Sequence, residues 1–323
     1  MTEAAPSRRR LTLFARLPPA MRFASPNGWA AARRNGDRCH SFLEGPCLDP
    51  AGRLLCVDIA NGRILRVADG DDPDAANRWS IVHGYDGWPT GLKCLADGSL
   101  RIADNRLGLL ALDEPAESNG AHRAIAPLVD RFGGQPLHGA NDLTIAADGS
   151  LYFTDQGESD LLRRFGRVLR RRPDGRVDLI ADGLPSPNGL ALSPDERLLY
   201  VAVTQANAIW RIILRPDDSV GKVGLFVQLS GSAGGGPDGL AVDAEGSLYV
   251  CHALAGCLRV FDRLGEPIAR IDTAAGLIPT NLAFGGPDRR TLFVTEAETG
   301  TIQTIRTEVP GLMPPPALHG VAR

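Results

Sequence analysis

Two short hydrophobic segments flank an Asp-Gly turn in the stretch Asn141-Asp-Leu-Thr-Ile-Ala-Ala-Asp-Gly-Ser-Leu-Tyr-Phe-Thr-Asp155. Asp-Gly between alternating hydrophobic residues is a strong signal for a β-hairpin, because glycine readily takes the positive φ that the turn requires. Related stretches lie at 45–58, 91–104, 188–202, 238–252 and 281–295, and their turns are 43 to 51 residues apart. The chain therefore contains six copies of one hairpin unit.

A period in the forties, with strands and no helical periodicity, is typical of the blades of a β-propeller. We predict an all-β fold, a six-bladed β-propeller with a central channel; a two-sheet β-sandwich does not explain six evenly spaced hairpins. Because an open ring would expose strand edges, we expect residues 11–16 to supply the outer strand of the last blade. The predicted organisation is one propeller domain at 11–308, with a disordered tail at 1–10 and a C-terminal tail at 309–323.

The 323 residues carry 35 basic and 38 acidic side chains, a formal net charge of −3. This balance predicts neither a nucleic-acid nor a membrane partner, and no apolar run reaches the ~20 residues that cross a bilayer. The arginines at 8–10 resemble an export signal, but Arg16, Pro18 and Pro19 interrupt the apolar stretch that follows. The six cysteines show no CxxC spacing. We therefore expect free thiols and a cytoplasmic protein, and its oligomeric state stays open.

The repeat register predicts a polar ring at one mouth of the channel. The residues eight positions before each turn all have an oxygen-bearing side chain: Glu44, Thr90, Asn141, Asn188, Asp238 and Asn281. The segment before the turn is expected to be the innermost strand of each blade, so equivalent residues would lie at one height around the axis. These six side chains would then converge.

Converging oxygens, two of them from carboxylates, favour a site for a hard cation. Burying Glu44 and Asp238 without a partner would be costly, and a divalent cation removes that cost. Without a histidine or cysteine in the ring, calcium is the first expectation; magnesium and manganese are alternatives, and zinc is the less suited one. The competing interpretation is that polar residues at strand starts only cap turns.

A second set of residues follows each turn by about six positions: Asp58, Asp104, Asp155, Ala202, His252 and Glu296. We interpret the three aspartates as structural acceptors for backbone N–H groups of the loops. His252, and His138 three residues before Asn141, are candidate substrate-binding residues, because histidine titrates near neutral pH. Each could equally be a hydrogen-bonding bystander.

With these motifs assembled, the sequence resembles the SMP-30/gluconolactonase family of six-bladed propeller lactonases. The resemblance runs from about 40 to 305 and is carried by Phe42-Leu-Glu-Gly-Pro46, Asn141-Asp-Leu143, Pro187-Asn-Gly-Leu190, Pro237-Asp-Gly-Leu240 and Pro279-Thr-Asn-Leu282. It implies one divalent cation held by Glu44, Asn188 and Asp238, with Asn141 contacting either metal or substrate. It also implies that Asp238 is the general base.

The resemblance implies a metal-dependent lactonase that opens a small-molecule lactone with water, with Thr90, Asn141, His138 and His252 as candidate substrate contacts. Two alternatives stay open: a metal-dependent aryl-ester or organophosphate hydrolase, and a non-catalytic binding propeller. Animal sugar-lactone enzymes of this family have an arginine two residues before the asparagine that matches Asn141. Here that residue is Gly139, so the substrate is not determined by the resemblance.

Overall fold

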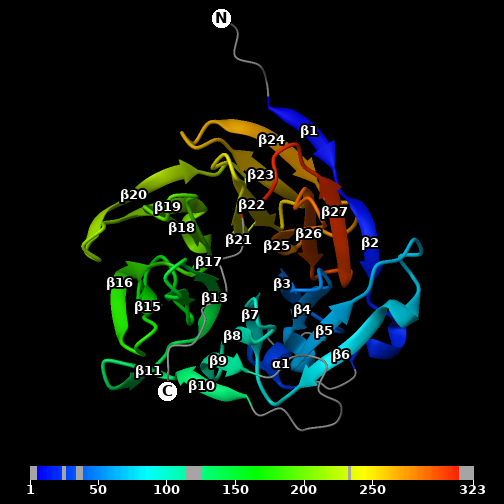
Figure 1. Cartoon of the computed structure of the whole chain (residues 1–323), viewed down its shortest axis with the longest axis horizontal. Coiled ribbons are helices and arrows are strands. Elements are labelled where there is room, and N and C mark those ends of the chain that lie inside the picture. Colours follow the sequence, from blue (N-terminus) through cyan, green and yellow to red (C-terminus); the bar gives the residue numbers. More distant parts are fainter. Residues whose placement is uncertain (1–5, 24–26, 34–38, 114–124, 232–233, 313–323) are drawn as a thin grey trace, which may run out of the picture.

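The computed structural model describes residues 6–23, 27–33, 39–113, 125–231 and 234–312. Six antiparallel β-sheets follow one another around a central axis, each forming one blade of a propeller (Figure 1). The predicted fold class is confirmed.

The blades are numbered here in chain order, and each sheet runs outward from its innermost strand. Blade one contains β3 (Leu43–Leu48), β4 (Leu54–Asp58), β5 (Arg63–Val67) and β6 (Trp79–Gly84). Blade two contains β7 (Pro89–Cys94), β8 (Leu100–Asp104), β9 (Gly108–Leu112) and β10 (Ala126–Val129). Blade three contains β13 (Ala140–Ile145), β14 (Leu151–Asp155), β15 (Gly166–Arg171) and β16 (Val177–Leu184).

The second half repeats this arrangement. Blade four contains β17 (Pro187–Leu192), β18 (Leu198–Val203), β19 (Ala208–Leu214) and β20 (Val220–Gln228). Blade five contains β21 (Gly236–Val242), β22 (Leu248–Ala253), β23 (Cys257–Phe261) and β24 (Pro267–Asp272). Blade six contains β25 (Pro279–Gly285), β26 (Thr291–Glu296), β27 (Thr301–Arg306) and β2 (Thr12–Arg16).

The Asp-Gly turns form as the sequence predicts. In blade three, Gly149 has φ +84° and its N–H donates to the carbonyl of Ala146 at 2.9 Å. The carboxylate of Asp148 accepts the N–H of Ser150 at 2.8 Å, which stabilises the same turn. The innermost strands of successive blades contact one another around the whole ring, from β3 through β25 and back to β3. The first residues of these strands therefore surround one channel.

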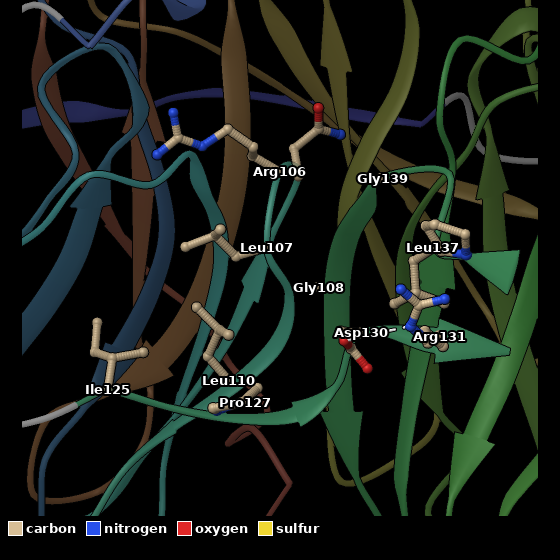
Figure 2. Close-up of a pocket in the computed structure, with 12 residues that line it drawn as sticks. Arg106, Leu107, Gly108, Leu110, Ile125, Pro127, Asp130, Arg131, Leu137 and Gly139 are labelled. Atoms are coloured by element: carbon tan, nitrogen blue, oxygen red, sulfur yellow. Dashed lines mark ion pairs between the residues drawn. The ribbon is translucent and has the colours of Figure 1, made fainter. Parts of the chain in front are cut away.

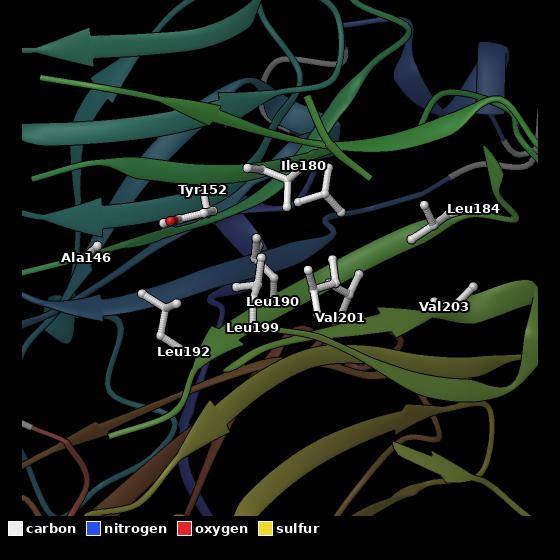
Figure 3. Close-up of a cluster of buried hydrophobic side chains, with 11 residues drawn as sticks. Ala146, Tyr152, Ile180, Leu184, Leu190, Leu192, Leu199, Val201 and Val203 are labelled. Carbon is white, nitrogen blue, oxygen red and sulfur yellow. The ribbon is translucent and has the colours of Figure 1, made fainter. Parts of the chain in front are cut away.

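Hydrophobic side chains fill the space between successive blades. Figure 3 shows the cluster between blades three and four, where Tyr152 and Ile180 face Leu190, Leu199 and Val201. Five comparable clusters occupy the other blade interfaces. Because full burial of each aliphatic side chain contributes roughly 1.5–3 kcal/mol, these interfaces hold the ring together. The channel can therefore carry polar residues.

The N-terminal segment closes the ring. β2 pairs antiparallel with β27 as the outer strand of blade six, which confirms the predicted closure. The expected tail at 1–10 is wrong in its last four residues: β1 (Ser7–Arg10) adds to blade five, parallel to β24. That edge offered free N–H and C=O groups, and β1 pairs with them. Residues 1–5 lie outside the described part.

The C-terminal boundary also differs from the expected tail at 309–323. Gly311 forms an isolated β-bridge with Asp243, and the carbonyl of Pro310 accepts the N–H of Ala244 at 2.9 Å. Residues 309–312 are therefore attached to the propeller, and residues 313–323 lie outside the described part.

Short elements occupy the loops. The helices are η1 (Pro19–Met21), α1 (Trp29–Arg33), η2 (Ile59–Asn61), η3 (Ala76–Arg78) and η4 (Thr204–Ala206), and β11 (Arg131–Phe132) and β12 (Gln135–Pro136) form a small hairpin. Among the described residues, no helix has the length and apolar character needed to span a membrane.

Candidate functional site

Five of the six predicted ring residues line one cavity of about 200 Å³ at a mouth of the channel: Glu44, Thr90, Asn141, Asn188 and Asp238. Each lies at the bulged start of an inner strand, as its second residue in blades one to four and as its third residue in blade five. Because side chains alternate along a strand, the shared register turns all five toward the same cavity. These five side chains therefore converge at one mouth of the channel, as the repeat register predicts.

The sixth ring position differs from the prediction. Pro279 lies opposite Glu296 as Pro89 lies opposite Asp104, so Thr280, not Asn281, is in register with Thr90. The turn of blade six has one extra residue. A count of eight positions back from the turn therefore ends at Asn281, one residue after the true ring position. Asn281 is instead equivalent to Asp142, one step deeper in the channel.

Thr90 and Thr280 join neighbouring blades. The hydroxyl of Thr90 donates at 3.1 Å to the carbonyl of Ala140 in blade three, or at the same distance to Ala103. The hydroxyl of Thr280 donates at 2.7 Å to the carbonyl of Leu43 in blade one. Thr90 lines the cavity, but its proton is used by the backbone, so only its oxygen lone pairs can face a ligand.

Within the described ranges, neither ring carboxylate forms an ion pair with a cationic side chain. Burial raises the pKa of Glu44 well above its ordinary value, and the charges of Asp238 and Asp142 raise it further. Burial also raises the pKa of Asp238, as does the charge of Asp142, while a hydrogen bond from Asn188 opposes the shift. Two carboxylates kept close together in a poorly hydrated cavity repel each other, and a divalent cation between them would remove that repulsion.

A deeper polar layer was missed by the sequence analysis. The side-chain amide of Asn281 in blade six donates to the carboxylate of Asp142 in blade three at 3.2 Å, across the channel. Burial raises the pKa of Asp142, and the positive charge of Lys93 opposes this shift.

Glycines occupy the equivalent positions of the other four blades: Gly45, Gly91, Gly189 and Gly239. A Cβ at Gly91 would come within 2.8 Å of the Asp142 carboxylate, and one at Gly239 within 2.3 Å of the Asn281 amide oxygen. The signal was present in the sequence, because Asp142 stands where most copies have glycine.

The second set of acidic residues is structural, as interpreted from the sequence. Asp58, Asp104 and Asp155 accept the N–H groups of Phe42, Trp88 and Gly139, in each case the residue before an inner strand, at 2.8–2.9 Å. Glu296 does the same for Ile278 at 3.1 Å. Blade four has Val203 at this position, opposite Pro187, and not Ala202.

His252 takes the same position in blade five, opposite Pro237. It is fully buried, and neither ring nitrogen has a hydrogen-bond partner among the described residues. Burial, together with the positive charges of Arg259 and Arg270, lowers the pKa of His252 to about 4. His252 is not among the residues that line the cavity.

His138 is exposed on the loop before β13, and its ring packs against Phe165 with centroids 5.0 Å apart. It does not line the cavity either. The structure thus brings together Thr90, Asn141, Asn188, Asp238 and Glu44, and leaves both predicted histidines outside.

Seven further residues complete the cavity and were not predicted: Trp29, Arg33, Phe42, Ile59, Asn105, Gln156 and Glu158. Gln156 sets the orientation of Asn141, because its side-chain oxygen accepts the amide N–H of Asn141 at 2.9 Å. The amide oxygen of Asn141 is then free to act as a ligand. Ile59, Asn105 and Gln156 each directly follow an aspartate of the second set, but they share no residue type, and the other four lie in a loop or in the segment before blade one.

The donor set at the mouth fits a hard cation better than a transition metal. Two carboxylates and two amide side chains supply only oxygen ligands, which calcium and magnesium prefer. Within the described ranges, no group of three or more His, Cys, Asp or Glu side chains is arranged to hold a metal. A cation here would therefore depend on the asparagines as well as the carboxylates.

A larger cavity, of about 440 Å³, lies on the flank between blades two and three. Figure 2 shows it beside Leu107, Leu110 and Ile125, with Asp130 and Arg131 forming an ion pair at 3.8 Å. It contains no ring residue, and its ion pair is exposed. The smaller cavity at the channel mouth is the candidate site.

Comparisons with known proteins agree with this architecture. The chain is 31% identical to a gluconolactonase of Zymomonas mobilis over 68% of its length, which is 64% of that relative and so under two thirds of it. It is 31% identical to pentonolactonase XacC of Haloferax volcanii, over 79% of this chain and 81% of that one. It is 28% identical to diisopropyl-fluorophosphatase of Loligo vulgaris, over 78% of this chain and 79% of that one.

A solved structure of XC5397 from Xanthomonas campestris, described as a gluconolactonase, superposes with a TM-score of 0.68. It is 23% identical and covers 96% of this chain and 99% of that one, which supports the fold. The family model described as the SMP-30/gluconolactonase/LRE-like region matches residues 42–298. That match covers most of the chain and all of the candidate ring, and the protein belongs to the SMP-30/gluconolactonase/LRE-like family.

Proposed function

We propose that the protein is a metal-dependent lactonase that hydrolyses a cyclic ester to a hydroxy acid at the channel mouth. The observation that carries the proposal is the pair of carboxylates, Glu44 and Asp238, which face one cavity with raised pKa values and no cationic partner in the described chain. The names of the gluconolactonase and pentonolactonase relatives support the lactone as the substrate class.

Glu44, Asn188, Asp238 and Asn141 would hold one divalent cation, with calcium as the first candidate and magnesium, manganese or zinc as alternatives. When bound, the cation would polarise the ester carbonyl and stabilise the negative charge that develops on its oxygen. A solved structure described as the calcium-binding protein regucalcin from Agrobacterium tumefaciens has the same fold, at 24% identity and a TM-score of 0.71.

The side chains of this protein would divide the remaining work. Asp238 accepts a proton from the attacking water while the water oxygen bonds to the carbonyl carbon. The ring C–O bond then breaks, and the leaving oxygen takes that proton. Asn141, held by Gln156, orients the substrate, and Trp29, Phe42 and Ile59 limit access of bulk water.

A second candidate is hydrolysis of an organophosphate, favoured by the similarity to diisopropyl-fluorophosphatase. The same oxygen ring could stabilise a phosphoryl oxygen in place of a carbonyl oxygen. The two candidates differ in the reacting centre and can be separated by kinetics.

The test is a substrate panel with and without metal. Purified protein should hydrolyse five- and six-membered lactones with a higher kcat/KM than phenyl acetate or diisopropyl fluorophosphate. Chelation should abolish turnover, and added calcium should restore it. Full turnover by a metal-free preparation would contradict the mechanism, and a preference for the fluorophosphate would favour the second candidate.

The proposal includes the cytoplasm as the working compartment. Five of the cysteines carry free thiols in the described structure, and four of these are buried, namely Cys47, Cys56, Cys251 and Cys257. Free thiols suit a reducing compartment. The proposed partner is a small-molecule lactone alone.

A further inference from the structure

A short helix before the first blade covers one side of the candidate site. α1 is attached through Asn27, whose side-chain amide donates to the carbonyls of Ile59 at 2.7 Å and Gly87 at 2.6 Å. The amide oxygen of Asn27 accepts the N–H of Trp29 at 3.2 Å and so starts the helix. Trp29 is buried against Phe42, with ring centroids 4.9 Å apart. The helix is therefore docked firmly on blades one and two.

The last residue of α1, Arg33, reaches across the mouth to two other loops. One terminal nitrogen of its guanidinium donates to the carboxylate of Glu158 after blade three's second strand. The other donates to the amide oxygen of Asn105 in blade two, at 2.9 Å. The guanidinium carbon lies 5.5 Å from the centroid of the Trp88 ring. Arg33, Asn105 and Glu158 all line the cavity.

One donor of this group is not used by the protein. The Nε of Arg33 is buried and has no hydrogen-bond partner within the described residues. An unpaired buried N–H costs free energy unless a ligand or water accepts it. Glu158 still has exposed carboxylate surface, since its side chain is 65% exposed. Each terminal nitrogen of Arg33 also has a second N–H, and the side chain is 23% exposed, so the pair offers both a donor and an acceptor at the mouth.

Arg33 is the only residue with a cationic side chain among the described residues that line the cavity. Residue 139 is glycine, with φ +146°, and a Cβ there would lie 2.7 Å from the side-chain nitrogen of Asn105. A larger residue at 139 would have to displace Asn105, which is the partner of Arg33.

We propose that Arg33, with Glu158, determines substrate specificity by binding neighbouring hydroxyl groups on the lactone ring. Paired donors and acceptors match adjacent hydroxyls, and the apolar side chains of Trp29, Phe42 and Ile59 in the same lining match the C–H face of such a ring. A cavity of about 200 Å³ suits one small ring more than a long acyl chain. The expected effect on hydrolysis rests on the proposed function, whereas the expected effect on binding of the hydroxylated ring does not.

The experiment compares rings with and without hydroxyls in the full-length wild-type protein, in Arg33→Gln and in a matched control. Arg163→Gln is the control, because Arg163 forms an exposed pair with Asp160 in the same loop region but outside the cavity. The substrates are D-glucono-1,5-lactone and δ-valerolactone. The non-hydrolysable probes are the corresponding lactams, D-gluconolactam and δ-valerolactam, measured by calorimetry in calcium. Calcium affinity is measured on each variant.

Arg33→Gln should lower kcat/KM for the hydroxylated lactone by about 10-fold or more, mainly through KM, and weaken the hydroxylated lactam by a similar factor. In the same variant, kcat/KM for δ-valerolactone, the affinity for δ-valerolactam and the affinity for calcium should each change less than about 2-fold. Arg163→Gln should match wild type in every measurement. Equal losses for both ring types, or no loss, would overturn the inference, as would wild-type protein that fails to bind the hydroxylated lactam. Selective lactam binding without turnover of any lactone would instead refute the proposed function alone.

Discussion

Two sets of acidic residues lie one strand apart at the same mouth of the propeller, in opposite surroundings. Asp58, on a second strand, accepts hydrogen bonds from the N–H of Phe42, the amide of Asn61 and the guanidinium of Arg63 at 2.8–3.1 Å. Asp238, on an inner strand, accepts a hydrogen bond from the amide of Asn188, the one donor found for it among the described residues, and its pKa is raised.

The difference separates structural from functional carboxylates. A carboxylate whose lone pairs are filled by buried donors stabilises the loop that supplies them. A carboxylate held near like charges without enough donors destabilises the folded protein, and a ligand is the simplest reason for its presence. The number of donors thus tells the two rings apart where residue type does not.

The largest loss of stability should come from the second set of acidic residues, which bind the loops. Asp58→Ala leaves the guanidinium of Arg63 buried without its carboxylate, and removal of one partner of a buried pair costs about 3–5 kcal/mol. Denaturant unfolding would measure this loss. Calcium affinity of the folded fraction should stay near that of wild type. A variant that lost metal binding while keeping its stability would break the distinction between the rings.

Asp238→Asn should behave in the opposite way. It removes the proposed base, so kcat should fall by ~10²-fold or more, and calcium should bind more weakly because hard cations favour carboxylate over amide. The metal-free variant should be at least as stable as metal-free wild type, because a raised-pKa carboxylate has been removed. Steady-state kinetics, calorimetry and unfolding curves would check the three parts.

Glu44→Gln is the companion variant. It should mainly weaken calcium binding, with activity partly recovered at high calcium. Wild-type turnover by Asp238→Asn at saturating calcium would show that Asp238 is not the base, even if lactone hydrolysis stood.

His252 takes the place of a loop-capping carboxylate in blade five, and its burial predicts that the protein loses stability in acid. Burial, with a further contribution from Arg259 and Arg270, lowers its pKa to about 4 in the folded protein, below the ordinary value near 6.5. Between these values the unfolded chain binds a proton that the folded protein does not, so stability is present above pH 6.5 and is lost as pH falls. The free energy of unfolding should drop by about 2 kcal/mol from pH 7.5 to 5 through this residue.

His252→Leu tests the source of that slope. The variant should lose less stability than wild type over the same pH interval, as measured by denaturant unfolding at several pH values. An identical slope in the two proteins would assign the acid sensitivity to other groups.

The smallest effect should come from Thr90, which lies in the functional ring but bonds like a structural residue. Thr90→Ala removes the hydrogen bond to Ala140, at a cost of about 1 kcal/mol in stability. The kcat/KM for lactones should stay within about 2-fold of wild type. A loss as large as that of Asp238→Asn would return Thr90 to the set of substrate contacts.

The repeat pattern alone determined the propeller, its closure by the N-terminal strand and five of the six ring positions. These follow from local physics: Asp-Gly selects the hairpin turn, and the two-residue period of a strand gives equivalent residues the same direction. The structural role of Asp58, Asp104 and Asp155 was predictable for the same reason, since each caps a loop within its own blade.

The tertiary structure decided what depends on contacts between distant segments. Asp142 meets Asn281 across the channel, 139 residues away, only because the ring closes. Thr280 replaces Asn281 in the ring because strand pairing, and not distance from a longer turn, sets the register. Arg33 reaches the cavity because α1 docks on Ile59 and Gly87 through Asn27. His252 lies outside the cavity because its inner-strand partner is Pro237, not a ring residue. A repeat pattern describes each blade separately, whereas these features arise where blades and loops meet.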